Sequence, residues 1–265
     1  MQVLEVARLF SNYIAHIDAF LDNEVLRGMM VIGRRGMGKS YNLLQRLDER
    51  GVKYCLLKGH HTPLSFYRML YEHRKGCVLV LDDTVNVLKD REIQGLLLAA
   101  LDYDNRFVYW NSTSPLMDGL PESFEFNSKI VMLCNEVPRD DSVFSALMDR
   151  CLVYRLELSR DEILEAIDAI VRAKGYPIEI AEFIRENADS LELSLRLPDK
   201  IYSYYGRENW KALVMEVVRV DPVVAVVARL SRSSLPVKEQ VRRFMEETGL
   251  SRRTFFRIKR RLSNG

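Results

Sequence analysis

The sequence contains no hydrophobic run long enough to cross a membrane. Apolar stretches such as VVAVVA, residues 223–228, are far shorter than the ~20 residues that a membrane-spanning helix needs. Residues 1–23 have the pattern of an amphipathic helix that carries acidic residues, which is not the pattern of a secretory signal peptide. We therefore expect a cytoplasmic protein that makes no contact with a membrane.

Cysteine is scarce as well. The chain has only four cysteines, Cys55, Cys77, Cys134 and Cys151. None forms a C-x-x-C pair and each adjoins an apolar run, which predicts buried free thiols in a reducing compartment. His60 and His61 are adjacent, so their side chains point apart, and no cysteine or histidine lies at ligand spacing. We predict turn or nucleotide-pocket residues there rather than a metal site.

Acidic residues are few in the last part of the chain. Residues 229–262 contain eleven lysines and arginines against three glutamates, a net charge of +8, whereas the whole chain has a net charge of +2. The rest of the chain is therefore mildly acidic, with a net charge of −6. A basic segment beside an acidic body is typical of proteins that touch nucleic acid with that segment.

Short apolar runs alternate with helical patterns over the first 158 residues. Each run is almost uniformly apolar, as in strands buried on both faces, so an α/β fold with a parallel sheet is predicted. The predicted strands are Met29–Ile32, Tyr54–Leu57, Val78–Leu81, Ile130–Cys134 and Cys151–Leu156. Two further runs within residues 106–127, separated by the turn-rich SPLMDGLP, predict an extra hairpin ahead of the fourth strand.

The first predicted strand leads into GRRGMGKS, residues 33–40, which matches the phosphate-binding loop pattern G-x-x-x-x-G-K-[ST]. Glycines let successive backbone N–H groups curve around an anion, and the following helix adds free donors and a favourable dipole. Lys39 is expected to contact the β- and γ-phosphates of ATP, and the Ser40 hydroxyl to bind Mg²⁺. An ordinary glycine-rich turn is the alternative, but a strand before and a helix after favour the phosphate loop. The predicted nucleotide-binding residues are Gly33, Arg34, Arg35, Gly36, Met37, Gly38, Lys39, Ser40 and Tyr41.

The third predicted strand ends in two acidic residues, Asp82 and Asp83. A carboxylate at the carboxyl end of a parallel strand lies beside the phosphate loop, so Asp82 is expected to hold Mg²⁺ together with Ser40. Asp83 would then orient and polarise the water that attacks ATP. Two acids at a solvated strand end are the alternative interpretation.

Three further features accompany these two motifs: a strand that ends at Asn135, the segment ALMDR at 146–150 and the segment SLR at 194–196. Together these features make residues 1–205 resemble an AAA+ ATPase. The resemblance implies that Asn135 is the sensor-1 residue, which helps to place the attacking water. It also implies that Arg150 is the arginine finger, which enters a neighbouring subunit's site, and that Arg196 is the sensor-2 arginine of the lid. A finger that acts in trans requires a homo-oligomer, in this family usually a hexameric ring or spiral.

Each of these assignments has a simpler alternative. Asn135 is also suited to cap a turn, and Arg150 to form a surface ion pair, while Arg155 is close enough in sequence to be mistaken for the finger. Pro198 complicates the helix placement of Arg196. The chain departs from the family at Asp83, where glutamate is usual, and the shorter side chain sets the base back by one methylene group.

After residue 158 the pattern is helical throughout. Ser159 and Glu162 form a capping box, and Pro177, Pro198 and Pro222 mark further helix starts. These features predict an α-helical lid.

In the extra hairpin, the aromatic residues suit base stacking in a pore or, more simply, packing on the sheet. They are Tyr109, Trp110, Phe124 and Phe126.

The basic segment at residues 235–262 has the pattern of a helix-turn-helix. Pro236 begins the first helix, Gly249 allows a left-handed turn and Ser251 caps the second helix. The residues predicted to be buried are Val237, Val241, Phe244, Met245, Leu250, Phe255, Ile258 and Leu262. The open face of the second helix carries Arg252, Arg253, Phe256, Arg257 and Arg260 and suits the major groove of double-stranded DNA. A solvated basic helix that binds an acidic partner protein is the alternative.

The predicted domains are an α/β nucleotide-binding subdomain at residues 1–158, the lid and connecting helices at 159–230, and an all-α helix-turn-helix (winged-helix-like) domain at 231–265. This order resembles replication initiators and helicase loaders of the DnaA and archaeal Orc/Cdc6 kind, including compact ATPases of phages, archaeal viruses and plasmids. The expected function is ATP-dependent assembly on duplex DNA, with a helicase as partner. A transposition regulator with a transposase as partner and a non-hydrolysing ATP switch that binds DNA are the alternatives. A small-molecule kinase fits poorly, because a basic tail follows the lid.

Overall fold

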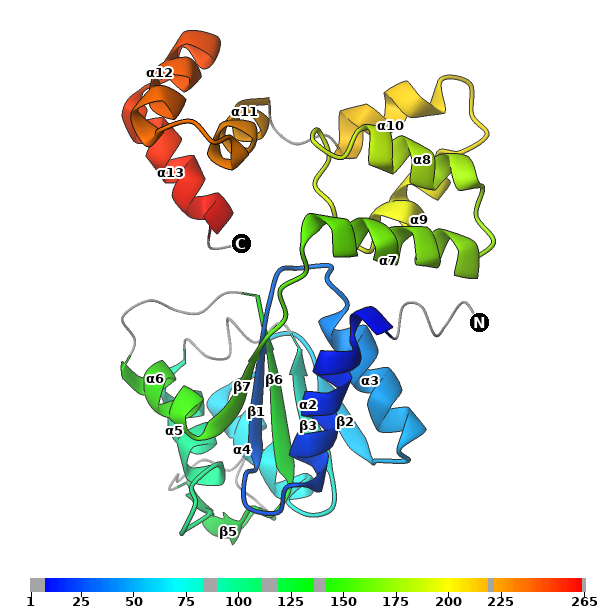
Figure 1. The fold of residues 1–265 in the computed structure, drawn as a ribbon. Helices are drawn as coiled ribbons and strands as arrows, with labels where there is room; N and C mark the ends of the chain where they lie inside the picture. Colours follow the sequence, from blue (N-terminus) through cyan, green and yellow to red (C-terminus); the bar gives the residue numbers. More distant parts are fainter. Residues whose placement is uncertain (1–7, 83–89, 111–118, 136–141, 219–221, 264–265) are drawn as a thin grey trace. The chain divides into compact units, whose positions relative to one another are not determined.

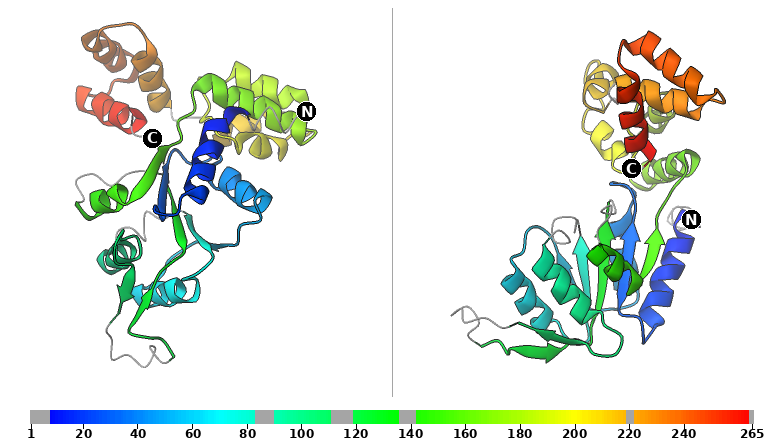
Figure 2. Two further views of the ribbon diagram at one scale, coloured as in Figure 1. Left: turned by 60° about the horizontal axis from the view of Figure 1, so that its bottom comes forward. Right: turned by 90° about the vertical axis from the view of Figure 1, so that its left-hand side faces the viewer.

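The computed structural model describes residues 8–82, 90–110, 119–135, 142–218 and 222–263. The chain divides into two compact units, one formed by residues 10–157 and the other mainly by residues 158–265. Figures 1 and 2 show a sheet with helices on both sides in the first unit, and helices in the second. None of the helices in these described ranges is both long and apolar enough to cross a membrane.

A five-stranded parallel sheet forms the centre of the first unit. Its strands are β1 (Gly28–Ile32), β2 (Tyr54–Leu57), β3 (Val78–Asp82), β6 (Lys129–Cys134) and β7 (Cys151–Arg155). They lie in the order β2-β3-β6-β1-β7, so β1 pairs with both β6 and β7. The predicted parallel sheet is confirmed, and each predicted strand agrees with the observed one to within one residue. Because the strands are parallel, the carboxyl ends of β1, β3 and β6 lie at the same edge of the sheet.

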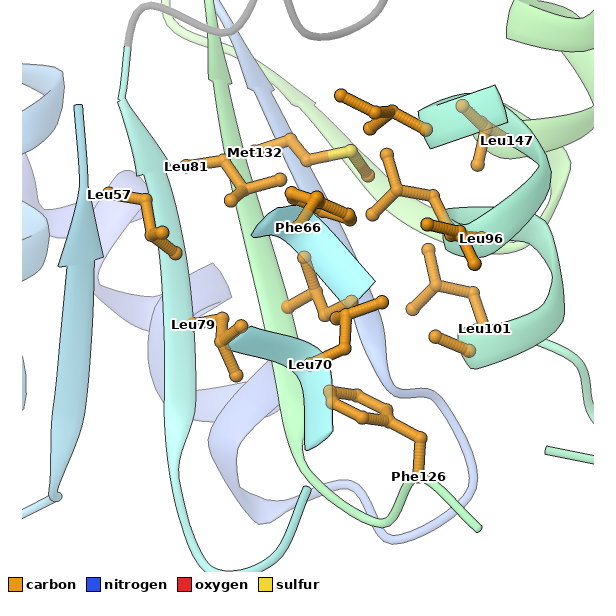
Figure 3. Close-up of a cluster of buried hydrophobic side chains, with 14 of the residues drawn as sticks. Leu57, Phe66, Leu70, Leu79, Leu81, Leu96, Leu101, Phe126, Met132 and Leu147 are labelled. Carbon is orange, nitrogen blue, oxygen red and sulfur yellow. The ribbon is translucent and has the colours of Figure 1, made fainter. Parts of the chain in front are cut away.

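Helices cover both faces of this sheet. The first face is covered by α4 (Pro63–Glu72), α5 (Arg91–Ala100) and α6 (Ser142–Asp149), and the second by α2 (Ser11–Asp22) and α3 (Lys39–Glu49). Figure 3 shows the core on the first face, where buried side chains of helices meet those of β3 and β6, among them Phe66, Leu70, Leu79, Leu81, Leu96, Met132 and Leu147. All of β1 is buried, which holds the start of the phosphate loop in the middle of the unit.

The predicted extra hairpin precedes β6. Its antiparallel strands are β4 (Phe107–Tyr109) and β5 (Ser123–Glu125). Phe124 and Phe126 are buried in the core of the first face, and Trp110 packs against that core. The hypothesis that Phe124 and Phe126 stack on bases is therefore wrong, because their rings are already buried in this core. Trp110 is half-buried, and for it the hypothesis stays a prediction. Tyr109, the fourth aromatic residue of that hypothesis, is exposed.

The second unit begins with a group of helices after β7. They are α7 (Arg160–Ala173), α8 (Ile178–Glu186), α9 (Leu197–Tyr202) and α10 (Trp210–Val218). The predicted capping box begins α7: the backbone N–H of Glu162 donates to the Ser159 hydroxyl, and the backbone N–H of Ser159 donates to the Glu162 carboxylate. Pro177 precedes α8 and Pro198 lies in the first turn of α9, as helix starts favour.

Three further helices share a small separate core. They are α11 (Pro222–Arg232), α12 (Val237–Thr248) and α13 (Arg252–Ser263). Val227 and Leu230 of α11 are buried in this core, so a boundary at residues 230/231 would divide a helix that the cluster needs. The cluster is a three-helix unit that starts at Pro222, and none of its described residues forms a strand.

The predicted turn of the helix-turn-helix is present, but its predicted core is too large. Gly249 ends α12 in the left-handed conformation, with φ 68°. Val241, Phe244 and Phe255 are buried, with the two phenylalanine rings 5.4 Å apart. The prediction of burial is wrong for four residues, which are 39–48% exposed: Val237, Met245, Leu250 and Leu262. In so small a cluster the two rings and α11 fill the core, and the flanking apolar residues stay at the surface.

Candidate functional site

The phosphate loop leaves β1 at Gly33 and enters α3 at Lys39. Gly36 and Gly38 have positive φ values of 73° and 82°, a conformation that glycine adopts without strain. Gly33 is required for another reason: a Cβ atom there would lie 2.5 Å from the backbone oxygen of Leu156. The backbone geometry thus explains each glycine of the predicted pattern.

Lys39 connects this loop with the end of β6. Its side chain is buried, and its ammonium group donates to the carbonyl oxygens of Gly33 and Arg34, at 2.5 and 2.9 Å. It also donates to Oδ1 of Asn135 at 3.0 Å. Two predicted site residues that are 96 positions apart in the sequence therefore lie in direct contact.

Ser40 and Asp82 form a second pair at the same edge of the sheet. The Ser40 hydroxyl donates to Oδ1 of Asp82 at 2.9 Å, across 42 residues of sequence. The ammonium group of Lys58, which follows β2, lies 3.5 Å from the other carboxylate oxygen. The first contact was predicted from the sequence, whereas the second was not, because no motif marks the residue after β2.

The donor set at this edge suits Mg²⁺. Hydroxyl and carboxylate oxygens are hard ligands, and Mg²⁺ is usually held by one or two protein groups while it keeps several waters or phosphate oxygens. Within the described residues, no group of three or more histidine, cysteine, aspartate or glutamate side chains could hold a metal ion. At this edge, Ser40 and Asp82 are the pair that could hold such a cation.

The remaining predicted loop residues differ in exposure. Arg34, Arg35 and Tyr41 are exposed, whereas Met37 is buried. The backbone N–H groups of such a loop, rather than its side chains, are the donors suited to phosphate. Asp83, the predicted base, lies outside the described residues.

Tyr13 is a site residue that the sequence analysis did not identify. This residue of α2 is fully buried, and its hydroxyl donates to the backbone oxygen of Lys39 at 3.1 Å. Its ring stacks on that of Tyr154, with centroids 5.3 Å apart and planes 10° apart. Burial raises the pKa of the Tyr13 hydroxyl, so it stays a hydrogen-bond donor. The only signal in the sequence was the amphipathic pattern of the helix.

Arg150 lies away from the phosphate loop of its own chain. It precedes β7, whose first residue is level with Gly28, whereas the loop begins after Ile32 at the other end of β1. The distance along the strand from Gly28 to Gly33 is about 16 Å at 3.3 Å per residue. Arg150 donates to the Ala146 oxygen at 3.2 Å and lies 3.8 Å from the Asp102 carboxylate.

Two other arginines, Arg155 and Arg196, are candidates from the sequence. Arg155 is exposed at the carboxyl end of β7, level with Ile32. It therefore lies at the same edge of the sheet as the phosphate loop, at the other end of β7 from the predicted finger Arg150. Arg196 is exposed directly before α9 and belongs to the second unit.

The open face of α13 carries the predicted DNA-binding residues. Arg252, Arg253, Arg257 and Arg260 are all exposed. At the flank of this face, next to Arg252, the Lys259 ammonium group donates to Oε1 of the buried Gln240 at 3.0 Å and so connects α13 to α12. The Ser251 hydroxyl, 3.4 Å from the backbone nitrogen of Thr254, caps the helix as predicted.

The arginines of α12 are in a different situation. Glu239 accepts hydrogen bonds from both Arg242 and Arg243, and Arg242 also pairs with Glu246. The two guanidinium groups lower the pKa of Glu239 to about 2, so it is ionised at neutral pH. The positive charge of α12 is therefore largely neutralised within the helix, whereas the α13 sequence contains no acidic residue. Most of the net positive charge of the cluster therefore belongs to α13, and α11 adds Arg229 and Arg232.

No family model matches this chain. The chain is 30% identical over 165 residues to an uncharacterized 36.7 kDa protein encoded in the nrdC-mobD intergenic region of Enterobacteria phage T4. The match covers 56% of this chain and 51% of the phage protein, so the chain spans about half the length of that relative.

The fold is similar to that of two AAA+ ATPases from Thermotoga maritima. The RuvB Holliday junction branch migration motor is 13% identical, with a TM-score of 0.54 over 91% of this chain and 81% of RuvB. Domain III of the replication initiation protein DnaA is 14% identical, with a TM-score of 0.52 over 78% of this chain and 90% of that domain. Together with the parallel sheet and the phosphate loop, these likenesses confirm the predicted AAA+ fold.

Proposed function

We propose that this chain, which has the AAA+ fold, is an ATPase that assembles on duplex DNA. One observation carries the proposal: Lys39 with Asn135, and Ser40 with Asp82, meet in hydrogen-bonded pairs at a single edge of the sheet. A buried lysine, a hydroxyl, a carboxylate and an amide around a glycine loop are the groups that bind a nucleoside triphosphate with a divalent cation.

In the proposed complex, the loop N–H groups and the amino end of α3 bind the phosphates of ATP. Lys39 exchanges its carbonyl partners for oxygens of the β- and γ-phosphates. Ser40 and Asp82 hold Mg²⁺, and the cation when bound neutralises charge that develops on the phosphate oxygens. The contact of Asn135 with Lys39 supports its role beside the γ-phosphate, where its amide orients water.

Asp83 is the proposed base for that water. Its side chain is one methylene group shorter than the glutamate usual in the family. This difference favours a second candidate function, a DNA-binding switch that binds ATP and hydrolyses it very slowly. Turnover measurements separate the two.

Arg150 supports an oligomeric enzyme. It lies at the end of β7 opposite the phosphate loop, and Asp102 and Ala146 hold its guanidinium there. From this position it serves the site of a neighbouring subunit rather than its own. Arg196 is the proposed lid arginine that contacts the γ-phosphate, because it is exposed and precedes the short helix α9.

The exposed arginines of α13 form the proposed contact with duplex DNA. The helix follows a glycine turn and a serine cap, and α12 has little net charge to offer. A helix of this kind fits the major groove, where arginine binds phosphates or the O6 and N7 atoms of guanine. We assign the output to replication initiation or helicase loading, and a transposition regulator would differ in its partner protein.

Steady-state ATP hydrolysis with and without duplex DNA tests the proposal. Lys39→Ala provides the blank, and a chain truncated after Val218 removes the whole α11–α13 cluster without cutting a helix. We expect DNA to stimulate the full chain and to leave the truncated chain unchanged. Tight ATP binding without turnover above the blank would contradict the ATPase and support the switch.

A mixing experiment tests the role of Arg150 in trans. Lys39→Ala lacks a working site but keeps its finger, and Arg150→Ala keeps its site but lacks the finger. If the finger acts between subunits, a mixture of the two inactive variants regains activity. Two variants that stay inactive when mixed, although each still assembles, would refute this role.

A further inference from the structure

Phe256 is an apolar residue on the otherwise cationic face of α13. Its side chain is 36% exposed, and Arg252, Arg253, Arg257 and Arg260 are exposed around it. At about 100° per residue, Phe256 lies about 60° around the helix from Arg253 and about 40° from Arg260. An exposed phenylalanine keeps apolar surface in contact with water, which is unfavourable, so its place on the proposed DNA-binding face needs an explanation.

Two neighbours fix the ring of Phe256. The buried ring of Phe255 meets it edge-on, with centroids 5.4 Å apart and planes 86° apart. The Arg252 guanidinium lies over its face, 5.4 Å from the centroid. Because Phe255 belongs to the core of the cluster, the Phe256 ring is anchored to that core while one side stays exposed. A ring held in this way loses little further freedom on binding.

The major groove offers one apolar feature that such a ring can contact. Guanine, cytosine and adenine present hydrogen-bonding groups there, and thymine alone adds a methyl group. A phenylalanine forms no hydrogen bond to a base edge, so on this face its favourable contact is the thymine methyl. The surrounding arginines bind phosphates or guanine and place the helix.

We propose that Phe256 is a specificity-determining residue that contacts the 5-methyl group of a thymine in the DNA site. The inference rests on the proposed binding of duplex DNA by α13 and adds the base that it reads. Arg252 is a positioning residue in this assignment, since its guanidinium covers one face of the ring and leaves the edge to the base. The binding site therefore contains a required thymine beside the positions that the arginines contact.

The test uses the full-length chain and a random duplex library. Sites selected by the wild-type chain are remade with each thymine in turn replaced by uracil, which removes only the methyl group. At one thymine we expect uracil to weaken wild-type binding about three- to tenfold, as expected for one buried methyl contact. Phe256→Ala should bind the thymine site about as weakly as the wild type binds the uracil site, and should not distinguish the two.

Leu262→Ala is the matched control. Leu262 is an apolar residue of the same helix with similar exposure, 41%, but lies about 140° around the helix from Arg257. This variant should keep the thymine preference, as should Phe256→Leu, which retains an apolar contact. Circular dichroism shows whether Phe256→Ala folds.

The possible results are distinguishable. Binding of duplex DNA with no effect of uracil at any position would overturn the role of Phe256 and leave the proposed function intact. An equal uracil effect in the wild-type chain and Phe256→Ala would also overturn it. If the wild-type chain fails to bind duplex DNA while its ATPase site works, the proposed function fails and an acidic partner protein for α13 becomes the better hypothesis.

Discussion

The Lys39 ammonium group lies 3.0 Å from Oδ1 of Asn135, a contact that joins the phosphate loop to the end of the neighbouring strand β6. Lys39 also donates to two carbonyl oxygens of its own loop, so loss of Asn135 leaves it with partners. Lys39, proposed to bind phosphate, and Asn135, proposed to place water, are therefore in contact. A mutation of Asn135 can still test its role separately, because Lys39 keeps its other partners.

Asn135→Ala is expected to reduce ATP turnover about 100-fold, the usual effect of removing one preorganised polar group from a reaction centre. The affinity for a non-hydrolysable ATP analogue should change little, because the loop and Lys39 remain. Asn187→Ala, in the lid, removes an amide that donates to the Phe183 oxygen and serves as control. Equal losses of binding and turnover in Asn135→Ala would show that Asn135 supports the loop rather than the reaction.

Gly33→Ala should abolish nucleotide binding and lower the free energy of unfolding by about 1–3 kcal/mol, as overpacking does. The added Cβ would lie 2.5 Å from the Leu156 backbone oxygen, which cannot move without disturbing β7. Gly95→Ala is the matched control, because a Cβ in this exposed position of α5 meets nothing within 4 Å. It should raise the free energy of unfolding by about 0.5–1 kcal/mol. Urea denaturation measures both.

Tyr13→Phe removes the hydroxyl that donates to the Lys39 oxygen and should lower the free energy of unfolding by about 1 kcal/mol. Binding of an ATP analogue should also weaken, since this bond fixes the first turn of α3. Tyr67→Phe removes a similar bond, to the Pro121 oxygen at 2.8 Å, on the other face of the sheet. It should cost similar stability with unchanged binding. Weakened binding in both variants would argue against a specific role of Tyr13.

Asp18→Asn should make stability less dependent on pH. Hydrogen bonds from Arg46 and Arg50 hold the pKa of Asp18 below its usual range, so the unfolded chain takes up this proton before the folded chain does. The ion pair therefore contributes fully above the unfolded pKa of about 3.9 and is lost as pH falls through the folded pKa. We expect Asp18→Asn to lower the free energy of unfolding by about 0.5–1 kcal/mol at pH 7.

Thermal unfolding between pH 7 and pH 2.5 checks this prediction. The difference between the wild-type chain and Asp18→Asn should shrink as the pH falls below 4. Asp22→Asn is the control, since Asp22 pairs only with Arg50 among the described ion pairs and is much more exposed, so its effect should be smaller. A difference that stays constant with pH would mean that the carboxylate charge is unimportant.

The site residues that could be predicted from the sequence are those that lie at or just after the carboxyl ends of parallel strands. Ser40 and Asp82 were expected to meet because parallel strands place their carboxyl ends at one edge, and they lie 2.9 Å apart. Tyr13 and Lys58 were not predicted, because their contacts depend on how α2 and the end of β2 lie against the loop, which no local pattern encodes.

The helix-turn-helix shows a different limit. Helical periodicity correctly identified the side of α12 that faces the core, where Val241 and Phe244 are buried. Periodicity does not show how far a core extends, and Met245 and Leu250 remain exposed because the three helices are too small to cover them. The packing of α11 on α12 and α13 was missed because an amphipathic pattern shows that a helix has an apolar face but not which helices that face contacts.

Strand β7 links two places that serve different subunits under the proposed function. At one end its continuation, Leu156, touches Gly33 of the same chain's phosphate loop, and at the other it follows Arg150. A paired strand is almost inextensible, so any sliding of β7 along its axis displaces both ends equally. A closing loop in one subunit would therefore move the arginine offered to the next. If Arg150 acts in trans as proposed, β7 therefore couples the phosphate loop of one subunit to the site of the next.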